Sequence, residues 1–165
     1  MILYLLRHGI AEEHGSRASD EERKLVQEGK DKTRDIMKSL ARMKYPVPEL
    51  VISSSLVRAN ETAQIAIEYF ASDAKFKTSE ALRPMSDVVD TMALVHEHIR
   101  EYRTIMLVGH EPHLSSFGSS LLGCPHPVIE MKKSAVALFE LHRIEVPRMR
   151  GVLLALFPPR IGSLK

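Results

Sequence analysis

Short apolar runs bounded by turn-forming residues recur along the chain, and each run has the length of a buried β-strand. In the first run, residues 2–6 are all apolar or aromatic, and the run stops at Arg7-His8-Gly9. Continuous apolarity of this kind is typical of a parallel strand, because helices cover both of its faces. The pattern predicts strands at residues 2–6, 49–53, 75–79, 104–108, 135–142 and 151–157.

Segments with the residue spacing of an amphipathic helix separate the first five predicted strands. The first of these helices ends before Pro46, which breaks helices, but its start is open because Gly29 costs about 1 kcal/mol against alanine inside a helix. Ser86 is a favourable N-cap for the third helix, and Pro112 suits the first position of the fourth. The predicted helices are residues 33–43, 56–71, 86–102 and 112–122.

This order of elements predicts an α/β protein, a three-layer α/β/α sandwich around a mostly parallel, six-stranded sheet. The last two strands are joined by a basic turn at residues 143–150, and adjacent strands of this kind usually pair antiparallel. Residues 1–165 are expected to form one domain, and the tail from Pro158 has no regular pattern. The segments after the first, second and fourth strands would meet at the carboxyl edge of the sheet, where ligands bind in such folds.

Composition and charge narrow the classes of function only slightly. The chain is 44% hydrophobic and 27% charged, and its net charge of +2 is too small to indicate nucleic-acid binding. Cys124 is the only cysteine, which excludes an internal disulfide. No apolar stretch has the length of a membrane span, and the first residues lack the pattern of a signal peptide, so the cytoplasm is the expected location.

Arg7 and His8 follow the first predicted strand, and this pair of residues suits phosphoryl chemistry. A guanidinium group matches phosphate oxygens as a two-pronged donor, and a neutral imidazole can attack phosphorus and hold the group covalently. Gly9 would let the backbone turn sharply or approach a ligand closely. A strand that merely ends in water-facing polar residues would look the same, so the motif needs support from elsewhere in the chain.

Two further motifs supply that support. The pattern Ser-x-x-x-Arg-Ala-x-x-Thr spans residues 54–62 after the second predicted strand, and Gly109-His110 follows the fourth. Together with Arg7-His8-Gly9, and in this order, these motifs resemble the histidine phosphatase (phosphoglycerate mutase-like) superfamily. The resemblance covers nearly the whole chain, and the compact form is most similar to the SixA-type phosphohistidine phosphatases. It implies the fold described above, with one antiparallel strand among six.

The resemblance assigns roles to four residues that match the catalytic quartet of the family. His8 would be the nucleophile that carries a covalent phosphate, while Arg7 and Arg58 would hold the phosphoryl oxygens. His110 would be a further donor in the transition state, and water would then release phosphate from His8. Arg58 in the first turn of a helix opposes the helix dipole, which suggests an anion nearby. Positioning and charge stabilisation of this kind need no metal or other cofactor.

Three more residues are candidate substrate contacts, namely Gly9, Ser54 and Glu80. Ser54 falls on the serine of the family motif, and it would either add a hydroxyl contact or simply turn the strand. Where mutase-like members place a glutamate as general acid, this chain has Pro84, and the SixA-like branch shares that proline. Glu80 or Asp87 could substitute for the acid, but carboxylates near two arginines are equally well explained as charge partners.

The missing acid favours hydrolysis of a P–N bond over a P–O bond. An alkoxide leaving group needs an acid, a contribution of roughly 10²–10⁴ in rate, whereas solvent can protonate the imidazole of a phosphohistidine. The expected function is a metal-independent phosphohistidine phosphatase whose partner is a phosphohistidine-bearing phosphotransfer or signalling protein. The alternatives are a phosphatase acting on small phosphomonoesters and a non-catalytic phospho-binding module, and mutase activity is disfavoured.

Three further features of the sequence each allow two interpretations. The polar loop of residues 10–20, in which Ser19 and Glu22 fit a capping box, is either a lid or a plain solvated loop. The basic residues around 132–133 and 143–150 would face either an acidic partner or solvent. His110 and His113 have the spacing of a zinc pair, but no Cys or acidic cluster completes it, so no metal is expected.

Overall fold

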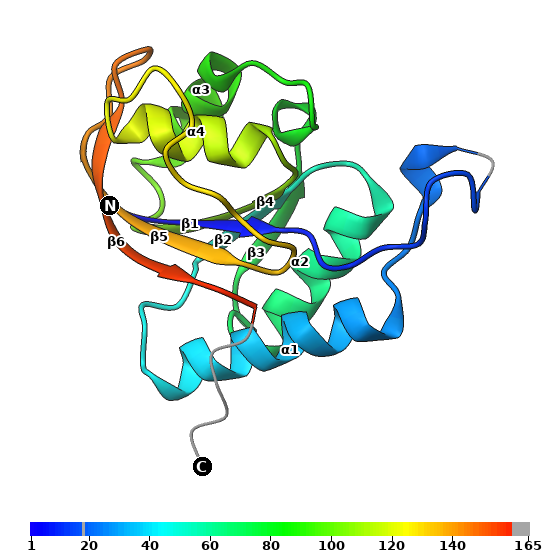
Figure 1. Cartoon of the computed structure of the whole chain (residues 1–165). Coiled ribbons are helices and arrows are strands. Elements are labelled where there is room, and N and C mark those ends of the chain that lie inside the picture. The colour runs from blue at the N-terminus through cyan, green and yellow to red at the C-terminus, as the bar shows by residue number, and fades with distance from the viewer. Residues whose placement is uncertain (18, 160–165) are drawn as a thin grey trace.

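The computed structural model describes residues 1–17 and 19–159, in which strands and helices alternate as predicted (Figure 1). The strands are β1 (Ile2–Arg7), β2 (Leu50–Ser53), β3 (Lys75–Thr78), β4 (Thr104–Gly109), β5 (Val136–Arg143) and β6 (Arg150–Phe157). The helices are α1 (Gln27–Arg42), α2 (Val57–Tyr69), α3 (Val88–His98) and α4 (His113–Leu121), with short 3₁₀ turns η1 (Asp20–Glu22) and η2 (Glu80–Leu82).

The strands form one mixed sheet in the order β3-β2-β4-β1-β5-β6. The strands β3, β2, β4 and β1 are parallel, whereas β5 pairs antiparallel with both β1 and β6. Because β6 then runs in the same direction as β1, β5 is the single opposing strand among the described residues. This arrangement confirms the predicted α/β sandwich with one antiparallel strand.

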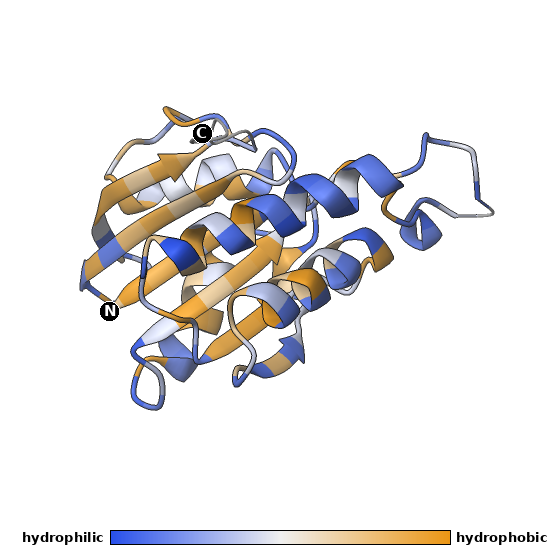
Figure 2. Cartoon of the chain, turned by 90° about the horizontal axis from the view of Figure 1, so that it is seen from below, coloured by the Kyte–Doolittle hydropathy of each residue, from blue (hydrophilic) through white to orange (hydrophobic). Residues whose placement is uncertain are grey.

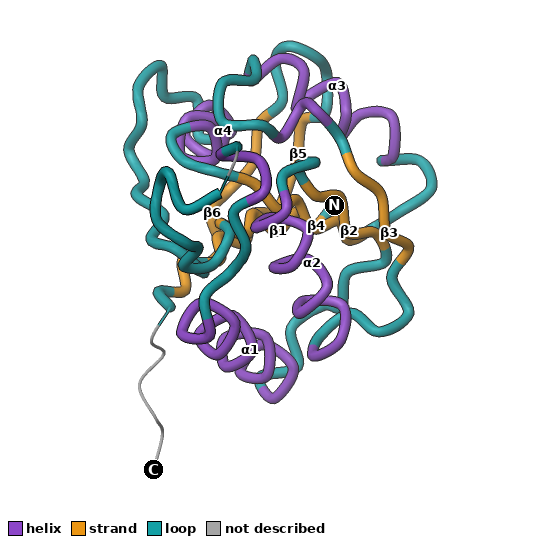
Figure 3. The backbone as a smooth tube through the Cα atoms, turned by 90° about the vertical axis from the view of Figure 1, so that its right-hand side faces the viewer, coloured by secondary structure: helices purple, strands orange, loops and turns teal. Residues whose placement is uncertain are grey.

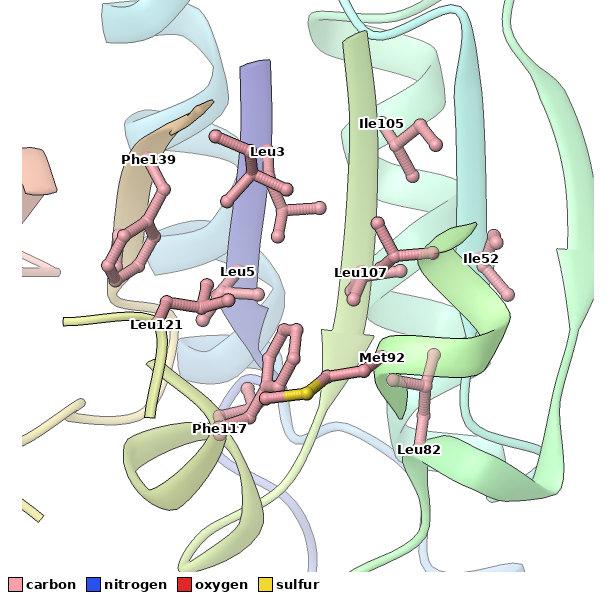
Figure 4. Close-up of a cluster of buried hydrophobic side chains, with 14 of the residues drawn as sticks. Leu3, Leu5, Ile52, Leu82, Met92, Ile105, Leu107, Phe117, Leu121 and Phe139 are labelled. Carbon is pink, nitrogen blue, oxygen red and sulfur yellow. The ribbon is translucent and has the colours of Figure 1, made fainter. Parts of the chain in front are cut away.

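Helices cover both faces of the sheet, with α1 and α2 on one face and α3 and α4 on the other (Figures 1 and 3). Successive side chains of β1 point to opposite faces. Leu3 and Leu5 therefore pack in the α3–α4 layer, where Figure 4 shows them with Phe117, while Tyr4 and Leu6 pack in the α1–α2 layer. Burial on both faces fixes β1 in the core, so the residues at its carboxyl end start from a rigid base.

Helix α1 begins at Gln27, well before the clear periodicity at residue 33, and it includes Gly29. Its outer face is largely hydrophilic (Figure 2). Gly29 is buried, and a Cβ atom there would lie 2.1 Å from the carbonyl oxygen of Ile10. A Cβ atom on Gly9 would lie 2.9 Å from the carbonyl oxygen of Gly29. The two glycines thus let α1 touch the backbone that leaves β1, so Gly9 serves close packing and not the close approach of a ligand.

The start of α3 corrects one predicted cap. The carboxylate of Asp87, and not the hydroxyl of Ser86, accepts a hydrogen bond from the amide of Val89, at 2.8 Å. Ser86 instead donates to the carbonyl oxygen of Glu80 at 2.7 Å. Both residues are favourable N-cap types, so their tertiary surroundings decide between them. The helix also ends at His98, earlier than predicted.

Two other predictions about helix starts are wrong in detail. Ser19 precedes η1, but its side chain makes no capping hydrogen bond, so a helical turn forms without the predicted capping box. Pro112 lies immediately before α4 and not in its first turn. Residues 160–165 of the predicted irregular tail lie outside the described residues.

Candidate active site

The carboxyl ends of β1, β4 and β2 lie side by side because these strands are neighbours in the sheet. Arg7 of β1 is level with Gly109 of β4, and Ser53 at the end of β2 is level with Val108 of β4. The segments that follow the three strands therefore meet at one edge, around a cavity of about 680 Å³. The residues that line it include all four members of the predicted quartet, Arg7, His8, Arg58 and His110.

His8 is buried in the wall of this cavity, 7% exposed. Its Nδ1 atom lies 2.7 Å from the carbonyl oxygen of Gly9. A carbonyl oxygen only accepts, so Nδ1 carries the proton and Nε2 keeps a lone pair in the neutral ring. Burial lowers the pKa of His8 to about 3, and the charges of Arg58 and Arg7 add to the effect, although the bond to Gly9 opposes it. The ring is therefore neutral at pH 7, as a nucleophile requires.

His110 faces His8, with the ring centroids 4.9 Å apart. Burial lowers the pKa of His110 to about 2, and the neighbouring His8 and Arg58 lower it further. Its Nε2 atom lies 2.9 Å from the hydroxyl oxygen of Ser54, and its buried Nδ1 atom has no hydrogen-bond partner among the described residues. Ser54 is fully buried and does not line the cavity. It therefore orients His110, a role that the sequence did not suggest.

Each of the two arginines of the quartet has some N–H groups that are hydrogen-bonded to described residues and one buried N–H group that is not. Arg7 donates from Nη1 to the carbonyl oxygen of Met131 at 2.7 Å. Arg58 donates from Nη1 to the backbone oxygen of Asp20 at 2.8 Å and from Nη2 to its carboxylate at 3.0 Å. The Nε atoms of both arginines are buried without a partner in the described part of the chain. An unsatisfied buried donor costs about 1–3 kcal/mol, so these groups favour an anion that accepts from them.

The loop after His8 supplies residues that the sequence analysis did not single out. Glu12, His14 and Asp20 line the cavity together with Arg23, so both described ends of the loop of residues 10–20 border the site. The carboxylate of Asp20 holds Arg58, accepts from Arg23 Nε at 2.7 Å and lies 3.0 Å from His14 Nδ1. Only the i, i+3 spacing of Asp20 and Arg23 could have indicated this cluster from the sequence.

Glu80 does not reach the cavity, contrary to the prediction that it contacts substrate. Its exposed carboxylate accepts from Arg83 at 2.8 Å, and contacts with Ser55 and Arg83 lower its pKa. A carboxyl group with a lowered pKa is a poor proton donor, so Glu80 acts as a charge partner. Asp87, the other candidate acid, is engaged as the cap of α3. Gly9 is also absent from the lining, and its amide donates to the hydroxyl oxygen of Thr62 at 3.1 Å.

His113 points away from any joint metal site with His110. Its Nε2 atom lies 2.7 Å from the hydroxyl oxygen of Thr91, which ties α4 to α3. Within residues 1–17 and 19–159, no group of three His, Cys, Asp or Glu side chains is placed to hold a metal ion. Four lining residues remain that the sequence analysis gave no catalytic role, Ala11, Glu13, Glu111 and Lys133.

The buried histidines predict how stability depends on pH. Because folding lowers the pKa of His8 and His110 below the ordinary value of 6.5, the unfolded chain binds more protons than the folded chain below that pH. We expect the free energy of unfolding to be fully retained above about pH 6.5 and to fall below it, by up to about 1.4 kcal/mol per pH unit for each histidine. Denaturant unfolding between about pH 4.5 and 7.5 measures this slope.

The variant His8→Gln is the control for this slope, because it removes one of the titrating rings. We expect a shallower slope in this variant than in the wild type. The same slope in both proteins would contradict a lowered pKa at His8.

Comparison with known proteins agrees with this geometry. The sequence model of the histidine phosphatase superfamily (branch 1) matches residues 3–87, which include Arg7, His8 and Arg58. The chain therefore belongs to the histidine phosphatase superfamily. No curated protein matches the chain at the level of sequence.

Solved structures share the whole fold at low identity. The protein histidine phosphatase SixA in complex with tungstate is 22% identical, with a TM-score of 0.84 over 96% of this chain and 97% of that one. A protein assigned as SixA from Agrobacterium tumefaciens is 21% identical, with a TM-score of 0.79 over 96% and 97%. A mycobacterial glucosyl-3-phosphoglycerate phosphatase bound to VO3 is 20% identical, with a TM-score of 0.73 over 95% and 99%. These similarities confirm the predicted fold.

None of the helices in the described residues is both long and apolar enough to cross a membrane.

Proposed function

We propose that this chain is a phosphohistidine phosphatase that removes phosphate from a protein histidine through a covalent intermediate on His8. The observation that carries the proposal is the state of His8, whose Nδ1 atom is committed to the Gly9 carbonyl oxygen while its neutral ring lies in a cavity with two arginines. A neutral ring with a free Nε2 lone pair is the form of histidine that attacks phosphorus.

In the first step, the Nε2 lone pair of His8 attacks phosphorus, and the bond from phosphorus to the leaving group breaks. Arg7 and Arg58 stabilise the charge on the equatorial oxygens, which then accept from their unsatisfied Nε donors. His110 donates from Nδ1 when Ser54 donates to its Nε2 atom. Water then attacks the phosphorylated His8, and phosphate leaves. Two arginines and a second histidine can supply this stabilisation without a metal.

The presence of Pro84 in the cavity wall favours a phosphohistidine substrate. Pro84 lines the cavity where mutase-like relatives carry an acid, and it cannot donate a proton. An imidazole leaving group tolerates this absence because solvent can protonate it near neutral pH. The similarity to SixA structures supports the same substrate class, and the tungstate in one of them is a tetrahedral oxyanion like phosphate.

A phosphatase of small phosphomonoesters is the second candidate. It is favoured by the similarity to glucosyl-3-phosphoglycerate phosphatase, whose sequence identity of 20% is close to the 22% identity with SixA. A non-catalytic phosphate-binding module would use the same arginines, but binding alone does not need a nucleophilic His8.

The decisive experiment compares substrates for the wild-type protein. We expect kcat/KM for a phosphohistidine-bearing phosphotransfer domain to exceed that for phosphoserine and sugar phosphates, because the imidazole of a phosphohistidine is the better leaving group near neutral pH. EDTA is expected to have no effect. Faster hydrolysis of small phosphoesters would select the second candidate, and loss of activity reversed by a divalent metal would refute metal independence.

A further inference from the structure

Glu111 is the residue directly after His110, in the segment between β4 and α4, and it lines the same cavity as His8 and Pro84. Its Oε1 atom is buried and has no hydrogen-bond partner in the described part of the chain. Apart from the orphaned Nε atoms of Arg7 and Arg58 and the Nδ1 atom of His110, it is the only unsatisfied buried polar atom of the described cavity lining. The cavity wall thus holds one carboxyl group with an oxygen that no described residue has satisfied.

The surroundings of Glu111 favour its protonated form. Burial raises the pKa of the Glu111 carboxyl group, and the negative charge of Glu130 adds to this. Ser115 and the positive charge of Arg7 oppose the rise without cancelling it. By contrast, the exposed Glu80 is held in its ionised form. A carboxyl group with a raised pKa and an unpartnered oxygen in the cavity wall is suited to donate a proton to a bound molecule.

We infer that Glu111 is a catalytic general acid, which protonates the leaving-group oxygen of phosphoester substrates. It would take the place of the acid that mutase-like relatives carry at the position of Pro84. The inference rests on the proposed covalent chemistry of His8. As the Nε2 lone pair of His8 forms a bond to phosphorus, the P–O bond breaks, and its electron pair takes the proton of Glu111. The leaving group departs as a neutral alcohol, and Glu111 remains as a carboxylate.

The second step restores both residues. The Glu111 carboxylate accepts a proton from the attacking water as the oxygen of that water bonds to phosphorus. The P–N bond to His8 breaks, its electron pair returns to Nε2, and phosphate departs. The consequence is a broader substrate class than the empty acid position at Pro84 suggests, since phosphomonoesters with poor, alkoxide leaving groups become substrates as well as phosphohistidines.

The competing interpretation is that Glu111 is only a charge partner that positions Arg7. The two roles differ in their dependence on the leaving group. A positioning role affects every substrate equally, because each one presents the same phosphoryl group to Arg7. An acid affects only substrates whose leaving group needs a proton, such as an alkoxide, and hardly affects p-nitrophenolate, which is a stable anion.

The test measures kcat/KM of wild type and Glu111→Gln for two phosphomonoesters, glycerol phosphate and p-nitrophenyl phosphate. This parameter covers the steps up to phosphorylation of His8, where the acid acts. We expect the variant to lose about 100-fold or more on glycerol phosphate and less than about threefold on p-nitrophenyl phosphate. In the wild type, kcat/KM for glycerol phosphate should fall as the pH rises through the raised pKa of Glu111, and the variant should lack this fall.

Glu80→Gln is the matched control, because it removes an exposed carboxylate that pairs with Arg83 outside the cavity lining. We expect it to keep wild-type activity on both substrates. Activity of Glu111→Gln on p-nitrophenyl phosphate shows in the same sample that the variant is folded. Equal losses on both substrates, or no loss on glycerol phosphate, would overturn the inference. Labelling of His8 by phosphate would still test the proposed function on its own.

Discussion

Replacing His8 with alanine is expected to abolish turnover while the fold stays intact. Nucleophilic catalysis ends with the loss of the nucleophile, and we expect kcat to fall by about 10⁴-fold or more. The fold should survive because, among the described residues, the only hydrogen bond of the His8 side chain goes to the adjacent Gly9 carbonyl oxygen, so no long-range hydrogen bond is lost. Circular dichroism and denaturant unfolding check the fold, and steady-state assays check turnover.

The intermediate itself gives the sharper measurement. Wild-type protein that is mixed with a ³²P-labelled substrate and quenched during turnover should carry a label that is stable in alkali and labile in acid, as expected for a phosphohistidine. His8→Ala should carry none. His96 lies on the exposed surface of α3, so His96→Ala is a control that should label like the wild type. Substantial turnover or labelling in a well-folded His8→Ala protein would end the assignment of the nucleophile.

The meeting of the quartet could be predicted from the sequence because it follows from strand order. Each motif comes directly after a strand with a continuous apolar run, and parallel neighbours place their carboxyl ends at one edge. In the observed register Arg7 is level with Gly109, so His8 and His110 lie together. Strand order alone predicts this, and no long-range contact has to be known beforehand. A nucleophilic histidine needs its other nitrogen fixed, and the contact of His8 Nδ1 with the Gly9 carbonyl oxygen meets that need.

The partners of these residues could not be predicted, because they depend on contacts between segments that no local pattern links. Asp20 holds Arg58 across 38 positions of the chain, and Ser54 holds His110 across 56. Glu111 follows a motif histidine, but only burial distinguishes its carboxyl group from the exposed Glu80. The sequence favoured Glu80 because it lies near the expected position of the acid in the chain, and position in the chain does not report burial.

A glycine inside a helix, such as Gly29, is unusual, and the close contact of Gly29 with the backbone of Ile10 explains its presence. The same contact leads to the second prediction. Glycine-to-alanine changes inside an exposed helix stabilise a protein by about 0.5–1 kcal/mol, because alanine loses less backbone freedom on folding. At Gly29 the added Cβ atom would lie 2.1 Å from the carbonyl oxygen of Ile10 and 2.7 Å from its amide nitrogen. Both are backbone atoms, so no side chain can rotate to make room.

We therefore expect Gly29→Ala to reverse the usual sign and to lower the free energy of unfolding by about 3 kcal/mol. The strain would also displace Ile10, which follows the Gly9 carbonyl oxygen that fixes His8, so the activity of the folded fraction should fall as well. Denaturant unfolding of both proteins measures the first effect. Asp35→Ala, on the exposed face of the same helix, should stay within about 0.5 kcal/mol of wild type. A Gly29→Ala protein as stable as the wild type would mean that α1 does not press against the backbone beside His8, and the rigid placement of the nucleophile would lose its physical basis.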